Sequence, residues 1–296
     1  MVESLSIVGA GRVGRALGRR LRELGWKIGV VCASSEASAR KAVRFIGGGK
    51  PQAGLTVQVL ASKVVLLTVP DDAIPGVAGE LARIGGDEWR GLIVLHTSGA
   101  LDSTVLSALK SCGAAVGSMH PLQSFSGMGT PPLEGRVFGI EGDRPAVRIA
   151  RSIARTLEGT PVKLTAAKKA LYHAAGAFAA GHLLALEEAG VQLLMNAGIT
   201  RAAATKALLS LSRQVLDNCE KLGPHYAWTG PLSRGDYGVV ASHEEALQQC
   251  QPEFLEAYQS VSRLAARVLS QEAETMLKEL QTISERAQVS PKEKGR

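Results

Sequence analysis

Aromatic residues are scarce, at 4% of the 296 residues, and no cluster of Lys and Arg is interleaved with them. This scarcity argues against a nucleic-acid partner. Cysteines are few as well, and no pair forms a C-x-x-C motif or lies near a histidine at metal-ligand spacing. We therefore expect no metal site, and reduced thiols of the kind found in cytoplasmic proteins, at Cys32, Cys112, Cys219 and Cys250.

No long uninterrupted apolar run is present either. The most apolar stretch, 170–199, contains two histidines and two glutamates, which indicates a buried helix and not a membrane span. A strand-like run begins at Leu5, too early for a signal peptide to precede it, so we expect a cytoplasmic protein without a membrane partner. The net charge is +7, and residues 1–50 hold ten Lys or Arg against three Asp or Glu. This excess is either a solvated face or a field that attracts a polyanionic ligand.

The length and the ordinary content of hydrophobic residues, 45%, favour two globular domains. In the first half, short apolar runs alternate with helical patterns, as in βαβ units with a parallel sheet. The expected strands are 5–8, 27–32, 64–69, 92–96 and 114–119. The expected helices between them are 12–24, 36–46, 73–84 and 101–112.

From Pro145 onward the pattern is almost entirely helical, apart from a short strand at 161–164. The expected helices are 166–197, 200–221, 242–249 and 253–286, with an irregular Gly- and Pro-containing stretch at 223–240. The sequence thus predicts an α/β Rossmann domain with a parallel, doubly wound sheet at 1–160. An all-α domain follows at 161–289, with a flexible tail at 290–296.

A G-x-G-x-x-G motif directly follows the first strand and opens a helix, which is the context of a dinucleotide-binding turn. Gly9 makes the tight turn, Gly11 lets the backbone approach a pyrophosphate, and Gly14 lets the helix pack against the strand. The helix N-terminus offers unpaired N–H groups to the phosphates. The predicted cofactor-binding residues of this turn are Gly9, Ala10, Gly11, Arg12, Val13 and Gly14.

The end of the second strand distinguishes NAD from NADP. NAD-binding domains usually place a carboxylate there for the ribose 2′-hydroxyl, whereas this strand ends Val-Cys-Ala-Ser-Ser. Ser34 and Ser35 can donate hydrogen bonds to a 2′-phosphate, and Arg12, Arg40 and Lys41 can supply positive charge. NADP is therefore favoured over NAD.

The turns after two further strands also lie at the carboxyl edge of the predicted sheet, where ligands bind in open α/β folds. We expect these turns to line the ribose and nicotinamide of the cofactor. Their predicted residues are Val69, Pro70, Thr97, Ser98 and Gly99.

Six segments, GAGRVG, VPDD, HTSG, MHPLQSF, LYHAAG and TGPLSRGD, in this order, resemble a bacterial family described as Rossmann-like with a helical C-terminal domain of unknown function. The resemblance covers about residues 5–268. That family is similar in plan to pyrroline carboxylate reductase and, more distantly, to the β-hydroxyacid and 6-phosphogluconate dehydrogenases. The resemblance implies a C-terminal domain of the 6-phosphogluconate dehydrogenase type, nicotinamide-dependent chemistry and a homodimer formed through the helical domain.

His120 ends the strand of the HPLQSF segment on the expected nicotinamide side. Its ordinary pKa near 6.5 suits a general acid, and a structural role in the loop is the alternative. Gln123 and Ser124 can bind a substrate carbonyl or carboxylate.

Lys169 and His173 are four residues apart and share a helix face. In the related dehydrogenases a lysine and an asparagine have this spacing and the lysine is the general acid/base, which the resemblance implies for Lys169. Because His173 replaces the asparagine here, His173 or Tyr172 is an alternative proton donor.

In the loop Trp228–Asp236, Thr229 and Gly230 are predicted to contact substrate, as the resemblance to the reductases implies. Arg234 is suited to clamp a carboxylate or phosphate, and Asp236 can orient Arg234 or bind an amine. The alternative is that Arg234 and Asp236 pair only with each other.

The sequence therefore favours an NADP-dependent oxidoreductase that transfers a hydride between nicotinamide and a small anionic carbonyl or imine substrate. A non-catalytic NADP(H)-binding sensor or scaffold is the alternative, because fold alone does not establish chemistry.

Overall fold

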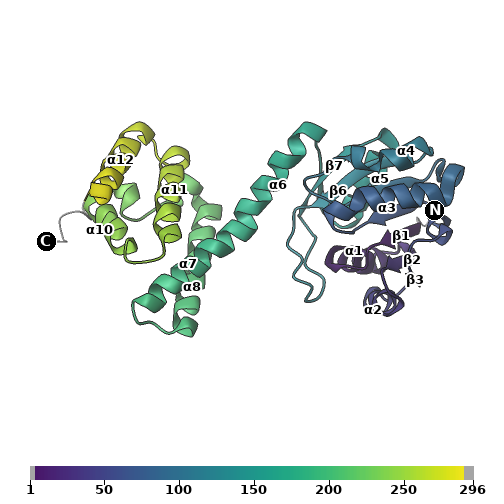
Figure 1. Cartoon of the computed structure of the whole chain (residues 1–296), viewed down its shortest axis with the longest axis horizontal. Coiled ribbons are helices and arrows are strands. Elements are labelled where there is room, and N and C mark those ends of the chain that lie inside the picture. Colours follow the sequence, from purple (N-terminus) through teal and green to yellow (C-terminus); the bar gives the residue numbers. More distant parts are fainter. Residues whose placement is uncertain (1–3, 290–296) are drawn as a thin grey trace. The chain divides into compact units, whose positions relative to one another are not determined.

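The computed structural model describes residues 4–289, and its internal contacts divide the chain into two compact units, 1–181 and 182–296. The first unit extends past the expected domain boundary at residue 160. It does so because β8 (Thr160–Lys163) adds a strand to the sheet and α6 (Lys169–Ala177) places side chains against it. Many of the helices and strands are labelled in Figure 1.

The first unit contains an eight-stranded sheet of order β3-β2-β1-β4-β5-β6-β7-β8. All neighbours are parallel except β6 and β7, which pair antiparallel. The strand order changes direction between β1 and β4, which is the switch point where open α/β sheets bind ligands. The strands other than β8 are β1 (Ser4–Val8), β2 (Lys27–Ala33), β3 (Lys50–Ala53), β4 (Val64–Leu67), β5 (Ile93–His96), β6 (Ala115–Pro121) and β7 (Val137–Gly142).

Two separate hydrophobic clusters cover the two faces of this sheet. One joins the strands to α1 (Arg12–Glu23), α2 (Glu36–Ile46) and α5 (Arg144–Thr156), and the other joins them to α3 (Ile74–Gly85) and α4 (Ser107–Ser111). Neighbouring residues of a strand point to opposite faces, so Ile7 enters the first cluster and Val8 the second. The predicted doubly wound Rossmann fold is confirmed.

Several predicted elements differ from the structure. The strands β3 and β7 and the helix α5 were not expected, and the expected helix 101–112 is a 3₁₀ turn (Ser103–Leu106) followed by the short α4. The two strands are not continuous apolar runs, which is why the sequence pattern does not predict them. Strand β3 contains Pro51 and Gln52, and β7 contains Gly139 and Glu141. The expected helix 166–197 is divided into a 3₁₀ turn, α6, a π-helical turn (Phe178–His182) and α7 (Leu183–Asn196).

The second unit is helical throughout its described part. It contains α7, α8 (Arg201–Leu222), α9 (Pro224–Ala227), α10 (Tyr237–Leu247), α11 (Pro252–Leu269) and α12 (Ala273–Val289). The expected single helix 253–286 is interrupted at Ser270, whose extended backbone ends α11 and whose hydroxyl accepts a hydrogen bond from the Glu272 N–H. A small core centred on Val240, Ala266 and Leu280 holds α10, α11 and α12 together.

A search of the described helices for one long and apolar enough to cross a membrane finds none. The expected tail, 290–296, lies outside the described residues.

Candidate active site

The glycine-rich turn after β1 is built by close contacts that two of its glycines allow. Gly9 has φ of +106°, and a Cβ there would lie 2.7–2.8 Å from the backbone of Thr68 and Val69. A Cβ on Gly14 would overlap the Gly9 carbonyl and the Thr68 hydroxyl. Gly11 differs, because its nearest neighbour is the Thr68 carbonyl oxygen at 3.8 Å. Gly9 and Gly14 are therefore required by packing, whereas Gly11 leaves open space.

The first backbone N–H groups of α1 lie at the open space beside Gly11. Gly11 is the N-cap and has no side chain to accept a hydrogen bond, and the first turn contains no acidic residue. The first N–H groups of a helix have no partner within the helix and carry a partial positive charge. Ala10 and Val13 pack against the core, and the exposed Arg12 lies beside Gly127 of the β6–β7 loop. This geometry suits a pyrophosphate.

At the end of β2 both predicted serines are exposed, and no carboxylate occupies the position after the strand. The Ser35 hydroxyl caps α2 by accepting from the Ser38 N–H at 3.3 Å, so it has a structural task. Arg40 pairs with Glu36 at 2.8 Å. Among the described residues the Ser34 side chain makes no hydrogen bond, which leaves its hydroxyl available to a ligand.

The turns after β4 and β5 are tied together at the same sheet edge. The Ser98 hydroxyl donates to Asp71 Oδ2 at 2.6 Å and accepts from the Ala100 and Leu101 N–H groups. Thr97 is held by its backbone N–H, which donates to the Leu67 carbonyl oxygen at 3.1 Å. The Ser98 side chain is therefore fully used within the protein, which leaves the backbone of these turns and Val69, Pro70, Thr97 and Gly99 as the candidates for ligand contact.

His96, which ends β5, is completely buried and fixes the turn that follows. Its Nδ1 accepts from the Ser98 N–H at 3.2 Å, so Nδ1 carries no proton and Nε2 donates to the Asp102 carbonyl oxygen at 3.2 Å. Burial lowers the pKa of His96 to about 4, and the nearby Lys169 ammonium acts in the same direction. The sequence reasoning missed this residue, although its place at a strand end in HTSG was a signal.

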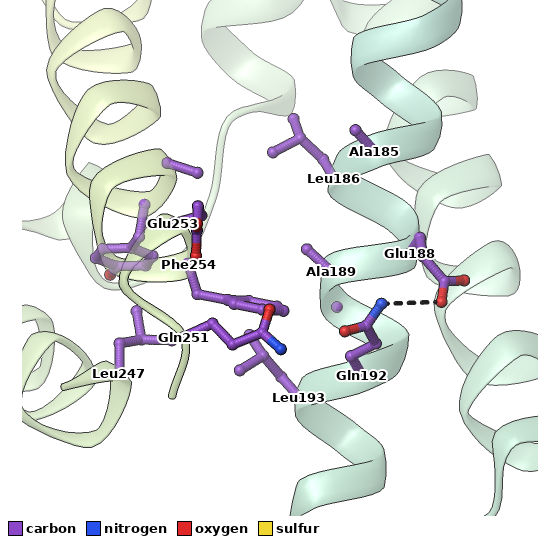
Figure 2. Close-up of a pocket in the computed structure, with 13 residues that line it drawn as sticks. Ala185, Leu186, Glu188, Ala189, Gln192, Leu193, Leu247, Gln251, Glu253 and Phe254 are labelled. Atoms are coloured by element: carbon purple, nitrogen blue, oxygen red, sulfur yellow. Dashed lines mark hydrogen bonds between the residues drawn. The ribbon is translucent and has the colours of Figure 1, made fainter. Parts of the chain in front are cut away.

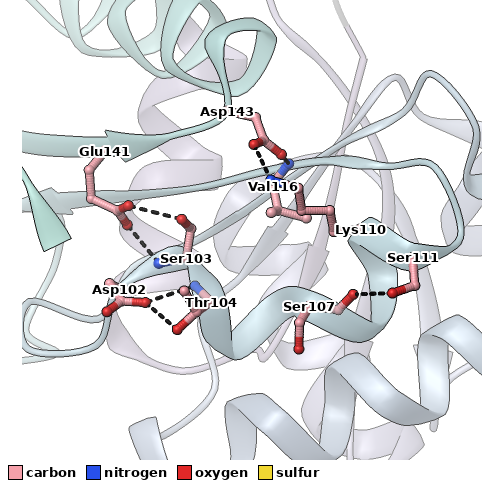
Figure 3. Close-up of polar contacts among 9 residues, drawn as sticks. All are labelled: Asp102, Ser103, Thr104, Ser107, Lys110, Ser111, Val116, Glu141 and Asp143. Carbon is pink, nitrogen blue, oxygen red and sulfur yellow. Dashed lines mark hydrogen bonds and ion pairs between the residues drawn. The ribbon is translucent and has the colours of Figure 1, made fainter.

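Lys169 is also completely buried. Its ammonium donates to the Ser98 carbonyl oxygen at 3.0 Å and to Ser118 Oγ at 2.7 Å. Burial lowers the pKa of Lys169 to about 8, while the carboxylates of Glu141, Asp102 and Asp71 act in the opposite direction. Glu141 in turn accepts hydrogen bonds from the backbone and hydroxyl of Ser103 (Figure 3). Lys169 therefore links β6 to the β5 turn from inside the protein.

Three other predicted residues meet on the outer side of this turn. The rings of His120 and His173 are 5.6 Å apart, and so are those of His120 and Tyr172. The Tyr172 hydroxyl donates to the His120 carbonyl oxygen at 3.1 Å. Gly99 lies against both imidazoles, since a Cβ there would be 2.9 Å from His120 Nε2 and would overlap His173.

The three side chains of this cluster differ in exposure. His120 and Tyr172 are half-buried, whereas His173 is exposed. Burial, assisted by the charges of His173 and Lys169, lowers the pKa of His120 to about 4. Burial raises the pKa of Tyr172. The cluster therefore contains one neutral imidazole, one neutral phenol and one imidazole in contact with solvent.

The remaining predicted residues are less closely tied to this cluster. Gln123 donates to the Pro132 carbonyl oxygen at 2.7 Å and accepts from the Ser124 N–H, so it closes the β6–β7 loop. Arg234 pairs with Asp236 at 2.8 Å in the second unit, and Gly230 accepts from the Ser233 hydroxyl at 2.9 Å. The pairing of Arg234 with Asp236 is the structural alternative that the sequence left open. Thr229 is exposed in the same loop.

The sheet and its helices have the architecture of a Rossmann-like domain, and the second half of the chain is helical. Residues 2–121 match the family model described as a Rossmann-like domain, and residues 136–265 match the one described as Domain of unknown function (DUF2520). These two matches, which follow one another along the chain, agree with the resemblance that the sequence predicts. A search of the curated proteins finds no match.

Several solved structures have the same fold. A protein of Bacteroides fragilis provisionally assigned as an NADP oxidoreductase is 20% identical, with a TM-score of 0.71 and coverage of 88% of this chain and 96% of that one. A protein of Thermotoga maritima is 25% identical, with a TM-score of 0.66 and coverage of 96% and 99%. The pyrroline-5-carboxylate reductase of Coxiella burnetii is 16% identical, with a TM-score of 0.56 and coverage of 97% and 98%. The chain therefore has the fold of these proteins along nearly its whole length.

Proposed function

We propose that this protein is an NADP-dependent oxidoreductase acting on a small carbonyl or imine substrate that carries an anionic group. The observation that carries this proposal is the meeting of the glycine-rich turn, the β4 and β5 turns and the His120–Tyr172–His173 cluster at one edge of one sheet. The two similar structures described as an NADP oxidoreductase and a pyrroline-5-carboxylate reductase support the reaction class. The anionic group is inferred from the sequence, in which Arg234 is suited to bind a carboxylate, although in the structure this guanidinium pairs with Asp236.

The residues present fit a nicotinamide dinucleotide. Gly11 and the first N–H groups of α1 receive the pyrophosphate, and Ser34, without a carboxylate beside it, faces the 2′-phosphate. Arg12 supplies positive charge near the pyrophosphate. When bound, the cofactor supplies hydride transfer, and the protein supplies orientation and the proton.

We assign proton exchange with the substrate to His173. It is the exposed member of the cluster, whereas the Lys169 ammonium is buried and occupied by Ser98 and Ser118. His120, neutral at pH 7 and hydrogen-bonded to Tyr172, lies against the ring of His173 beside Gly99. Lys169 has a positioning role. It fixes the β5 turn by its hydrogen bond to the Ser98 carbonyl oxygen, and its positive charge helps to lower the pKa of His120.

Calorimetric titration with NADPH and NADH tests the cofactor assignment. We expect NADPH to bind at least about tenfold more tightly, since the 2′-phosphate adds charge-assisted hydrogen bonds. Ser34→Asp places a carboxylate where the phosphate lies and is expected to remove or reverse this preference. Ser38→Asp, an exposed position in the first turn of the same helix, is the matched control. Failure of both nucleotides to bind at millimolar concentration would contradict the proposal.

A screen of small keto acids and cyclic imines with bound NADPH then tests catalysis. The His173→Asn variant, screened in parallel, should bind NADPH normally and lose about a hundredfold or more in turnover. Tight NADPH binding without turnover of any substrate would instead identify the protein as an NADP(H)-binding sensor.

We further propose that the protein is a homodimer formed through its helical unit. Large apolar side chains are exposed along α7 and α8, including Leu184 at 68% and Leu211 at 60% exposure. An apolar cavity of about 520 Å³ adjoins α7 and is lined by residues such as Leu186, Leu193 and Phe254 (Figure 2). Contiguous apolar surface of this kind marks a protein interface.

Sedimentation of the purified protein tests this proposal. We expect a dimer at micromolar concentration and a monomer for Leu211→Gln/Leu216→Gln, two exposed positions on α8. Val57→Gln, at an exposed apolar residue of the first unit, should leave the dimer intact. A monomeric wild-type protein would refute the dimer without bearing on cofactor binding.

A further inference from the structure

Helix α5 carries four arginines on one face. Arg144, Arg148, Arg151 and Arg155 follow each other at intervals of four, three and four residues, so they form a single row. The opposite face of α5 packs into the core through Ala146, Ala150, Ile153 and Ala154. At 1.5 Å per residue, the row extends over about 16 Å.

None of these four guanidinium groups has an ion pair or a hydrogen bond to any residue within 4–289. The acid that precedes α5, Asp143, is already used, because it accepts from the Val116 N–H at 3.1 Å and pairs with Lys110 at 2.5 Å (Figure 3). Arg151 Nε is shielded from solvent and has no partner. An unpaired, buried donor of this kind destabilises the folded protein.

The arginines surround a hollow of about 450 Å³, which Pro145 and Val147 complete. Like charges one helix turn apart repel each other, so the row by itself weakens α5. A ligand with several negative charges would remove that repulsion. Guanidinium groups bind phosphate oxygens bidentately, and four of them match a ligand with more than one phosphate.

We propose that the outer face of α5 is a binding site for a small molecule that carries two or more phosphate groups, separate from the dinucleotide site. Gly142, at the end of β7, pairs with Gly117 near the start of β6, so α5 begins at the sheet edge opposite the glycine-rich turn. A small molecule is favoured over nucleic acid, because the hollow is lined by a single helix and contains no aromatic side chain on which a base could stack.

Titration with tripolyphosphate in the presence of saturating NADPH tests this site, since NADPH fills the other phosphate site. We expect binding that weakens with ionic strength, and an increase in melting temperature. In Arg148→Gln/Arg151→Gln the affinity should fall about tenfold or more. In Arg83→Gln/Arg90→Gln, which removes the same charge from exposed positions of the same unit, the affinity should be unchanged.

The melting temperature of the unliganded Arg148→Gln/Arg151→Gln variant should be no lower than that of the wild type, because repulsion along α5 is relieved. Comparison of ATP with tripolyphosphate then shows whether a nucleoside adds to the phosphate chain. The proposal is overturned if tripolyphosphate does not bind, if both double variants weaken it equally, or if a short single-stranded RNA binds α5 and displaces tripolyphosphate. If NADPH itself fails to bind, the comparison of Arg148→Gln/Arg151→Gln with Arg83→Gln/Arg90→Gln still tests the α5 site. Failure of the cofactor proposal can therefore be distinguished from failure of the α5 proposal.

Discussion

Gly14→Ala should lower the free energy of unfolding by about 3 kcal/mol and abolish measurable NADPH binding. The new methyl group would overlap the Gly9 carbonyl oxygen and the Thr68 hydroxyl, and the first of these is backbone that cannot rotate away. Overpacking of a fixed site costs about 1–3 kcal/mol, and relief requires α1 to move away from β1. Urea denaturation measures the first effect, and calorimetric titration measures the second.

Substitutions at two other glycines distinguish the effect of packing on stability from the effect of steric access on NADPH binding. Gly11→Ala should cost less than about 1 kcal/mol, because its nearest neighbour is 3.8 Å away, yet it should weaken NADPH binding about tenfold to a hundredfold by occupying the space of the pyrophosphate. Gly79→Ala, on the exposed face of α3 with no atom within 4 Å, should stabilise the protein by up to about 1 kcal/mol. If Gly11→Ala binds NADPH like the wild type, the pyrophosphate does not lie on this turn.

Acidification from pH 7 to pH 4.5 should destabilise the first unit through His96 and His120, because the pKa of each is lowered to about 4. The pKa of His96 is about 4 in the folded protein and near 6.5 in the unfolded chain. Between these values the unfolded chain binds more protons, so stability falls as the pH falls through this window. The full contribution of His96 is roughly 3 kcal/mol, present above pH 6.5 and lost by about pH 4.

Protonation of Nδ1 would also place an N–H against the Ser98 N–H, which breaks the hydrogen bond that holds the β5 turn. His96→Asn, which keeps an acceptor near that N–H, should therefore lose about half of the pH dependence of urea denaturation over this window, and His120 accounts for the rest. His225→Asn, at an exposed imidazole of the second unit, should retain the full pH dependence. A wild-type stability that stays constant from pH 7 to 4.5 would show that His96 is not held in its neutral form.

The dinucleotide turn could be predicted from the sequence because its chemistry is local. The spacing of Gly9, Gly11 and Gly14, directly between an apolar run and a helical pattern, is sufficient to place the turn, and the absence of a carboxylate after β2 is visible in the chain. The alternation of apolar runs and helical patterns likewise predicts a doubly wound sheet, since each βαβ unit is a local pattern.

The roles proposed for Lys169 and for the His120–Tyr172–His173 cluster depend on burial, which a local pattern does not reveal. Lys169 and His173 share a helix face and look equally available in the sequence, but Lys169 is completely buried and His173 is exposed. The partners of Lys169 lie 71 and 51 residues earlier in the chain, in the β5 turn and in β6. His96 shows the same dependence, because its buried site is created by the turn that it supports.

The sequence by itself determined the fold class, the glycine-rich turn and the candidate cofactor, because spacing, periodicity and the residue after a strand are properties of contiguous segments. The tertiary structure alone decided that the sheet gains β3 and an antiparallel β7, that Lys169 positions the β5 turn from inside, and that the arginines of α5 have no acidic partner among residues 4–289. These properties depend on which distant strands and turns meet, since desolvation and charge pairing are fixed only when the chain is folded.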